Sequence, residues 1–261
     1  RALCDGEAYA VPRLGDEETV DKLQALKVYT QYRDLISTAP LEIIYSGSAD
    51  LERVKQALAA AFATLPREEV RVISTAAPHV CRESVQHVED VLDVTQGKLG
   101  MGFSCGSDDM PALLMGNTLF GGSSNSKLFL NVREKLSLCY YASSLYHRQK
   151  GLITVSSGIE FQNYQRAYDE IMAQLEAVQK GELEDWELEG ARSTLLNSYA
   201  TVGDSQGKLE NFYLGQAATG QHETPADLAR AIQDMTAERI CRAMSTVKLD
   251  TVYFLCGEVE A

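Results

Sequence analysis

The segment with the most reactive side chains in this 261-residue chain is "FGGSSNSKLFLNVREKLSLCYYASS", residues 120–144. Its hydroxyls, thiol, guanidinium and phenols could serve nucleophilic catalysis, phosphate binding or the recognition of a carbonyl group. A serine hydrolase elbow reads G-x-S-x-G and a phosphate loop reads G-x-x-x-x-G-K-[ST]. Gly121, Gly122 and Lys127 fit neither spacing. Cys139 lies beside apolar residues in an expected strand, so packing is its expected role.

A zinc site is not indicated by the four histidines, which are His79, His87, His147 and His222. Zinc peptidases place two histidines one helical turn apart beside an acid. Neither H-x-x-x-H nor H-x-x-E-H occurs in the chain. We therefore expect it to hold no metal or other cofactor and to carry no catalytic residue of its own.

The glycine–serine turn at the start of the segment is suited to binding. Gly121 and Gly122 let the backbone turn tightly and approach another group closely. Ser123, Ser124 and Ser126 can cap the helix that follows. The free N–H groups at that helix start could receive a carbonyl or a carboxylate.

Arg133 and Tyr140 form a second candidate pair. They are seven residues apart, across the end of an expected helix and the start of an expected strand. This spacing could bring a guanidinium and a phenol to one edge, and both groups donate hydrogen bonds to a peptide carbonyl. The residues alone leave another interpretation open, in which Arg133 is a surface charge and Tyr140 is part of the core.

The elements that must position these groups alternate irregularly along the chain. Helices are expected at residues 21–37, 50–65, 108–120, 126–137, 163–180, 185–202, 206–219 and 224–247, the last with a break near Thr236. Strands are expected at 41–47, 80–91, 95–105, 139–148, 152–161 and 251–257, with the fourth and fifth forming a hairpin. This order predicts an α+β fold, with a mostly antiparallel or mixed sheet and helices on one face.

Composition indicates which classes of binding partner are unfavourable for this chain. The net charge of -13 makes nucleic acid an unfavourable partner. No apolar run approaches the roughly 20 residues of a membrane span, so no membrane partner is expected. The six cysteines are scattered without a C-x-x-C pair, which is typical of reduced thiols and predicts a cytoplasmic location.

The same segment resembles the second-half signature of the pitrilysin-type (M16) metallopeptidases, which often read GG…S-[RK]-L-[FY]…REK-x-G-L-x-Y. Three other passages are similar to that half in the right order: "LEIIYSGSADLERVKQALAAAFATLP", "TQGKLGMGF" and "DMTAERICRAM" with "VYFLCG". Together they cover roughly residues 17–257. Ser137 stands where the family usually has glycine.

The resemblance implies a fold and a role. Two α+β halves of such peptidases close around a peptide, and only the first half binds zinc. The second half supplies an arginine and a tyrosine seven residues apart, which Arg133 and Tyr140 match. Residues 121–126 fall where the non-catalytic subunit of mitochondrial processing peptidase has its glycine-rich loop. The implied function is a non-catalytic half that clamps a peptide or unfolded polypeptide, while zinc lies on a first half or homologous subunit.

The chain begins at Arg1 without methionine, and its opening resembles the passage that closes a first half. We therefore expect a fragment, with residues 1–16 as the end of that half or a linker and residues 17–261 as the second-half domain. "LCDGEAYAVPRLG" most resembles bacterial members whose first half has lost the zinc motif, linked to modification of elongation factor P. An inactive pseudopeptidase subunit that assembles with an active partner is thus an alternative, and a purely structural homodimerisation domain is a third.

Overall fold

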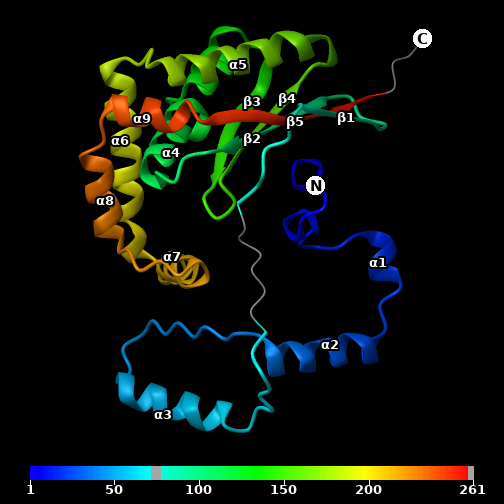
Figure 1. The fold of residues 1–261 in the computed structure, drawn as a ribbon, viewed down its shortest axis with the longest axis vertical. Coiled ribbons are helices and arrows are strands. Elements are labelled where there is room, and N and C mark those ends of the chain that lie inside the picture. The colour runs from blue at the N-terminus through cyan, green and yellow to red at the C-terminus, as the bar shows by residue number, and fades with distance from the viewer. Residues whose placement is uncertain (72–77, 258–261) are drawn as a thin grey trace. The chain divides into compact units, whose positions relative to one another are not determined.

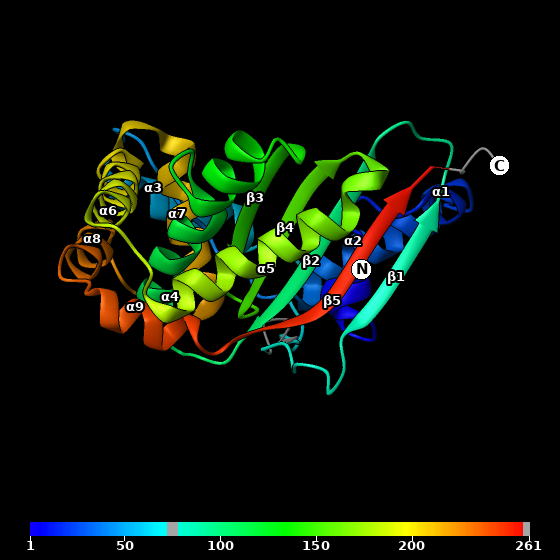
Figure 2. The same ribbon diagram turned by 90° about the horizontal axis from the view of Figure 1, so that it is seen from above.

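The computed structural model describes residues 1–71 and 78–257, and Figures 1 and 2 show it from two directions. These residues group into two compact units. Among the described residues, the larger unit is formed by 2–5, 78–202 and 223–257, and the smaller by residue 1 with 6–71 and 203–222. The predicted division after residue 16 concerns the halves of a longer protein, and it stays a prediction.

The larger unit contains a five-stranded sheet in the order β1-β5-β2-β4-β3. Its strands are β1 (Gln86–Val91), β2 (Gly97–Cys105), β3 (Cys139–His147), β4 (Leu152–Ile159) and β5 (Val247–Cys256). β1 runs parallel to β5, whereas the other three neighbouring pairs are antiparallel. The predicted mixed sheet of an α+β fold is therefore confirmed.

Helices of the larger unit cover the apolar face of this sheet. Leu99, Met101 and Phe103 of β2 are buried at every second position, because successive strand residues point to opposite faces. α5 lies along that face in both views (Figures 1 and 2) and buries its own apolar stripe. The helical elements of this unit are η1 (Ala2–Cys4), α4 (Met110–Asn117), η3 (Thr118–Gly122), η4 (Leu128–Lys135), η5 (Phe161–Asn163), α5 (Tyr164–Lys180), α6 (Asp185–Ala200), α8 (Pro225–Gln233) and α9 (Ala237–Met244).

Local signals account for several helix ends. Gly181 ends α5 with a φ of 77°, a left-handed conformation that glycine adopts without steric cost. Thr224 and Asp227 form a capping box at the start of α8. The predicted break near Thr236 is confirmed, since the side chain of this threonine caps α9. Within the described part of the chain, no helix has the length and apolar character that a bilayer crossing requires.

Several predictions of secondary structure differ from the structure. The strand predicted at 251–257 is β5, which begins at Val247, where a helix was expected to end. The predicted strand at 41–47 is wrong, because these residues have no strand conformation and pair with no strand among the described residues. β1 begins at Gln86 rather than near residue 80. The predicted helices at 108–120 and 126–137 contain π-helical turns, η3 and η4, in place of regular α-helix. π-Helical turns occur frequently at functional sites.

The smaller unit is mainly helical. It contains η2 (Ala8–Ala10), α1 (Glu17–Asp21), α2 (Ala25–Thr38), α3 (Leu51–Phe62) and α7 (Gln206–Thr219), and η6 (Val202–Asp204) lies at its chain boundary. Asp50 caps α3 as predicted, and Val54, Leu58 and Phe62 are its half-buried face. Arg67 donates to the carbonyls of Ile36 and Ala39, which fixes the chain after α3 against the end of α2.

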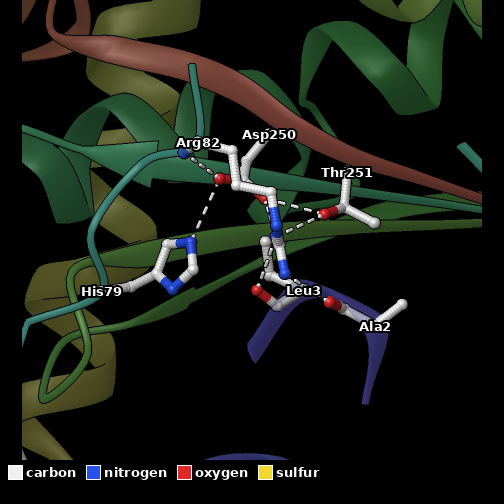
Figure 3. A network of polar contacts seen from close by, with 6 residues as sticks. All are labelled: Ala2, Leu3, His79, Arg82, Asp250 and Thr251. Carbon is white, nitrogen blue, oxygen red and sulfur yellow. Dashed lines mark hydrogen bonds and ion pairs between the residues drawn. The ribbon is translucent and has the colours of Figure 1, made fainter. Parts of the chain in front are cut away.

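A buried carboxylate ties the start of the chain to the sheet (Figure 3). Asp250 is the extra residue of a β-bulge in β5, because Gly102 pairs with Thr251 and Phe103 with Leu249. Its fully buried carboxylate accepts hydrogen bonds from the backbone and guanidinium of Arg82 and lies 3.1 Å from His79 Nε2. The same guanidinium donates to the carbonyls of Ala2 and Leu3.

Candidate functional site

Arg133 and Tyr140 come together at the junction of η4 and β3. Arg133 Nε donates to the backbone carbonyl of Tyr140 at 3.0 Å. The guanidinium lies 4.5 Å from the ring centroid of Phe129, and its Nη1 is 3.4 Å from a carboxylate oxygen of Glu134. These contacts hold the guanidinium in one place while the side chain stays partly exposed, which reduces the entropy lost on binding.

A second β-bulge sets the direction of Tyr140. Cys139 pairs with Ile159 and Tyr141 pairs with Gly158, so Tyr140 is the unpaired extra residue. The bulge turns this side chain away from the sheet, and it is 78% exposed. The alternative interpretation of the sequence, in which Tyr140 belongs to the core, is therefore wrong. A phenol and a guanidinium held at one edge can both donate to carbonyl oxygens of a polypeptide.

Ser137 makes the turn between these two residues. It has a φ of 48° and is the only non-glycine residue with positive φ in the described ranges. Leu138 then donates its N–H to the carbonyl of Val132, which closes the end of η4. The family glycine expected at Ser137 thus has a physical reason, because glycine adopts this backbone conformation without a steric penalty.

Replacing Ser137 with glycine should stabilise the protein by about 0.5–1 kcal/mol, since the relief of left-handed strain exceeds the added entropy of the unfolded chain. The measurement is the free energy of unfolding in urea. Ser124→Gly is the matched control, because Ser124 has no positive φ and should lose stability on the same exchange. A Ser137→Gly protein less stable than the original would contradict the strain argument.

The two glycines of the turn have close-packed surroundings. Gly121 is buried, and a Cβ placed there would lie 2.7 Å from Leu128 Cδ1 and 2.7 Å from Ser144 N. Gly122 is exposed, but its Cβ would lie 2.9 Å from Asn117 Nδ2. Gly121 therefore lets η3 pack directly onto β3, whereas Gly122 borders solvent.

The serines and Lys127 anchor the rest of the turn. Ser126 is fully buried, and its Oγ accepts the N–H of Phe129 at 3.4 Å, which caps the helical turn at Lys127 that leads into η4. Lys127 Nζ lies 3.0 Å from Glu187, and both side chains are nearly buried. Ser123 is half-buried and Ser124 is exposed. The turn is thus fixed to α6, while its tip is left open to solvent.

The predicted site residues therefore form two groups. Arg133 and Tyr140 are in direct contact, as the sequence spacing suggested. Gly121, Gly122, Ser123 and Ser124 precede η4, whereas Arg133 lies in its last turn, so the two groups stand at opposite ends of that element. Whether the glycine–serine turn contacts a ligand stays a prediction.

The cysteine and histidine side chains considered as reactive groups lie in surroundings that do not favour catalysis. Burial raises the pKa of the Cys139 thiol, and the opposing effects of Ser157 and the Arg133 charge do not cancel this shift. This cysteine is therefore protonated and unsuited to nucleophilic attack. His147 Nε2 is 3.0 Å from Thr154 Oγ1, and His79 faces Asp250. With no H-x-x-E-H in the chain, these residues do not fit the zinc site of the resembled peptidases.

Sequence reasoning missed two polar contacts between distant residues, the ion pair that anchors the glycine–serine turn and a histidine contact in the Asp250 network. Lys127 and Glu187 are 60 residues apart, and His79 and Asp250 are 171 residues apart. No local pattern joins such partners. The only sequence signal was a charged residue inside an otherwise apolar run, as with Asp250 just before "TVYFLC".

Comparisons with known proteins agree with the fold and with the family resemblance. The family model described as "Peptidase M16 inactive domain" matches residues 22–195. "Probable inactive metalloprotease YmfF" of Bacillus subtilis (strain 168) is 36% identical over 98% of this chain, which spans 60% of that protein. A conserved protein of Enterococcus faecalis V583 is 26% identical with a TM-score of 0.85, covering 96% of this chain and 60% of its own. A peptidase M16 inactive domain of Pseudomonas fluorescens has a TM-score of 0.79 at 17% identity, covering 99% of this chain and 64% of its own.

Proposed function

Because the chain belongs to the peptidase M16 family as one of its inactive domains, we propose that it binds an extended polypeptide through Arg133 and Tyr140. The observation that carries this proposal is the hydrogen bond from Arg133 Nε to the Tyr140 carbonyl beside the bulge. It fixes the Arg133 guanidinium against the backbone of Tyr140, whose exposed phenol extends from the same bulge. Backbone carbonyls of an unfolded segment are the acceptors that such donors fit, irrespective of sequence.

This chain is not the catalytic part of a peptidase. Its sequence lacks the H-x-x-E-H motif, and both the matching family model and the Bacillus subtilis relative YmfF are described as inactive. In the proposed role, the zinc site lies on a first-half domain or a homologous subunit, and the present domain contributes binding alone. Positioning of a substrate carbonyl is a sufficient contribution, because orientation and preformed hydrogen bonds supply much of an enzyme's rate enhancement. The predicted cytoplasmic location belongs to the same proposal.

A second candidate is an inactive subunit whose whole protein binds polypeptide without cleaving it. It is favoured by the name of the Bacillus subtilis relative, a probable inactive metalloprotease. The chain spans 60% of that relative. The two candidate functions differ in whether the rest of the longer protein contains a zinc site. An H-x-x-E-H motif and peptide cleavage by the longer protein would support the first candidate, whereas binding without cleavage would support the second.

Replacing Arg133 with alanine should weaken peptide binding about ten-fold, because the charged hydrogen-bond donor to the peptide is lost together with its contact to the Tyr140 carbonyl. The measurement is fluorescence anisotropy with labelled, end-blocked peptides that the unmodified chain selects from a peptide array. Tyr140→Phe, which removes only the hydroxyl, should weaken binding about three-fold. Arg133→Lys should recover little, because lysine lacks the planar fork of donors.

Arg242→Ala is the matched control, since it removes another arginine from a surface ion pair with Glu238. Its affinity for the same peptides should equal that of the unmodified chain. Peptide affinity that is unchanged in folded Arg133→Ala, or the absence of any selected peptide, would remove the basis of the proposed function.

A further inference from the structure

A cavity at the other edge of the sheet has no part in the site described above. It has a volume of about 360 Å³, and its lining includes Phe161, Tyr164, Val252, Phe254, His87 and Glu89. Figure 2 shows the two strands that carry four of these residues, β5 and β1, at the edge of the sheet. All six residues belong to the larger unit.

The pairing of β1 with β5 explains why polar and apolar groups meet in this cavity. His87 pairs with Val252 and Glu89 pairs with Phe254, so the paired side chains share one face of the sheet. The ring of Phe254 lies 4.6 Å from that of Tyr164, the first residue of α5. A Cβ at Gly97 would lie 3.0 Å from Phe161, so this glycine lets the aromatic wall approach β2.

The charge of the cavity is negative. Glu89 is exposed, and no lysine or arginine pairs with it in the described part of the chain. Burial raises the pKa of Tyr164 and of the Cys256 thiol, and the negative charge of Glu89 adds to both shifts. The N-terminus of α5 contributes a partial positive charge of about one half, which is smaller than the full charge of Glu89.

We propose that this cavity binds a lysine or arginine side chain of a partner polypeptide. Aromatic walls attract a cation through their ring faces, and an adjacent carboxylate adds an ion pair. The volume accommodates a long basic side chain, whose aliphatic stem packs on Val252 and Phe254 while its charge reaches Glu89. The acidic chain, with a net charge of -13, favours a basic partner at long range. This proposal does not depend on Arg133 or Tyr140.

The test is an NMR titration of the full chain with N-acetyl-arginine amide, compared with the uncharged isostere N-acetyl-citrulline amide. The arginine compound should shift the signals of His87, Glu89 and Tyr164 in a saturable way, and the citrulline compound should not. Glu89→Gln should weaken the arginine compound about five-fold. Phe161→Leu, which keeps the apolar bulk but removes the ring face, should weaken it about three-fold.

Glu210→Gln is the matched control, because it removes the same charge from an exposed glutamate of the smaller unit. It should leave the affinity unchanged. An end-blocked peptide that contains one arginine should bind more tightly than the free amide, and equal affinities would overturn a polypeptide as the partner. Equal shifts with both small compounds, or no saturable shift at these residues, would overturn the site, whereas the Arg133→Ala result bears only on the proposed function.

Discussion

Asp250→Asn should lower the free energy of unfolding by roughly 3 kcal/mol, because it leaves the Arg82 guanidinium without its buried counter-charge. The wild-type carboxylate is fully buried and accepts hydrogen bonds from Arg82 and from the hydroxyl of Thr251. An asparagine keeps the shape but offers one acceptor oxygen in place of two. The measurement is chemical unfolding at pH 7, with hydrogen exchange at residues 2–5 as the local readout.

The pH dependence of stability distinguishes the effect of the Asp250 charge from the effect of its side-chain shape. Burial by itself would raise the pKa of Asp250, but hydrogen bonds from the Arg82 backbone, Thr251, His79 and the Arg82 guanidinium lower it from 3.8 to about 2. A lowered folded-state pKa stabilises the protein above the unfolded value and ceases to do so as the pH falls. The stability difference between wild type and Asp250→Asn should therefore shrink between about pH 4 and pH 2.

Asp227→Asn is the control for this prediction. Asp227 also has a lowered pKa, caused first by the Thr224 hydroxyl, but it is a surface capping residue. Its replacement should cost much less stability than Asp250→Asn, because solvent screens this exposed carboxylate. The prediction would be contradicted if Asp250→Asn had the same small cost and left hydrogen exchange at residues 2–5 unchanged. That result would show that water solvates the Arg82 guanidinium as well as the carboxylate does.

Elements with strong local signals could be predicted from the sequence. The hairpin at 139–148 and 152–161 corresponds to β3 and β4, because alternating side chains flank a turn that ends in Gly151. The capping residues Asp50 and Thr224 were also found, since a cap needs only neighbours in the chain. Arg133 and Tyr140 belong to this group, because seven residues of local backbone bring them together.

Features that depend on distant partners could not be predicted. Residues 41–47 have the β-branched and aromatic composition of a strand, but a strand also needs a neighbour to receive its backbone hydrogen bonds. The bulges at Tyr140 and Asp250 are set by pairing register with β4 and β2, which no local pattern encodes. The outward direction of the Tyr140 side chain depends on such a bulge, so this part of the candidate site could not be predicted.

Gly121→Ala should lower the free energy of unfolding by roughly 3 kcal/mol, the upper end of the usual cost of overpacking. Its Cβ would lie 2.7 Å from both the backbone N and the Oγ of Ser144, and no side-chain rotation moves a backbone atom. Relief requires η3 to move away from β3. Chemical unfolding at pH 7 measures the loss.

Gly190→Ala is the control with the opposite sign. Gly190 lies inside α6, and its Cβ would meet Asn125 Nδ2 at an ordinary 3.7 Å. Alanine favours a helix over glycine by about 1 kcal/mol, so this variant should gain stability. Equal effects of the two exchanges would contradict the close packing of Gly121.

Peptide binding by Gly121→Ala, alone and combined with Ser137→Gly, separates two explanations of this glycine: packing against β3 and direct contact with a ligand. If Gly121 serves packing, a folded Gly121→Ala protein loses peptide affinity only as far as η3 displaces the exposed tip at Gly122 and Ser124. Its affinity should then recover when a stabilising exchange such as Ser137→Gly restores the fold. A full loss of binding in a protein that remains as stable as wild type would instead place the ligand directly against Gly121.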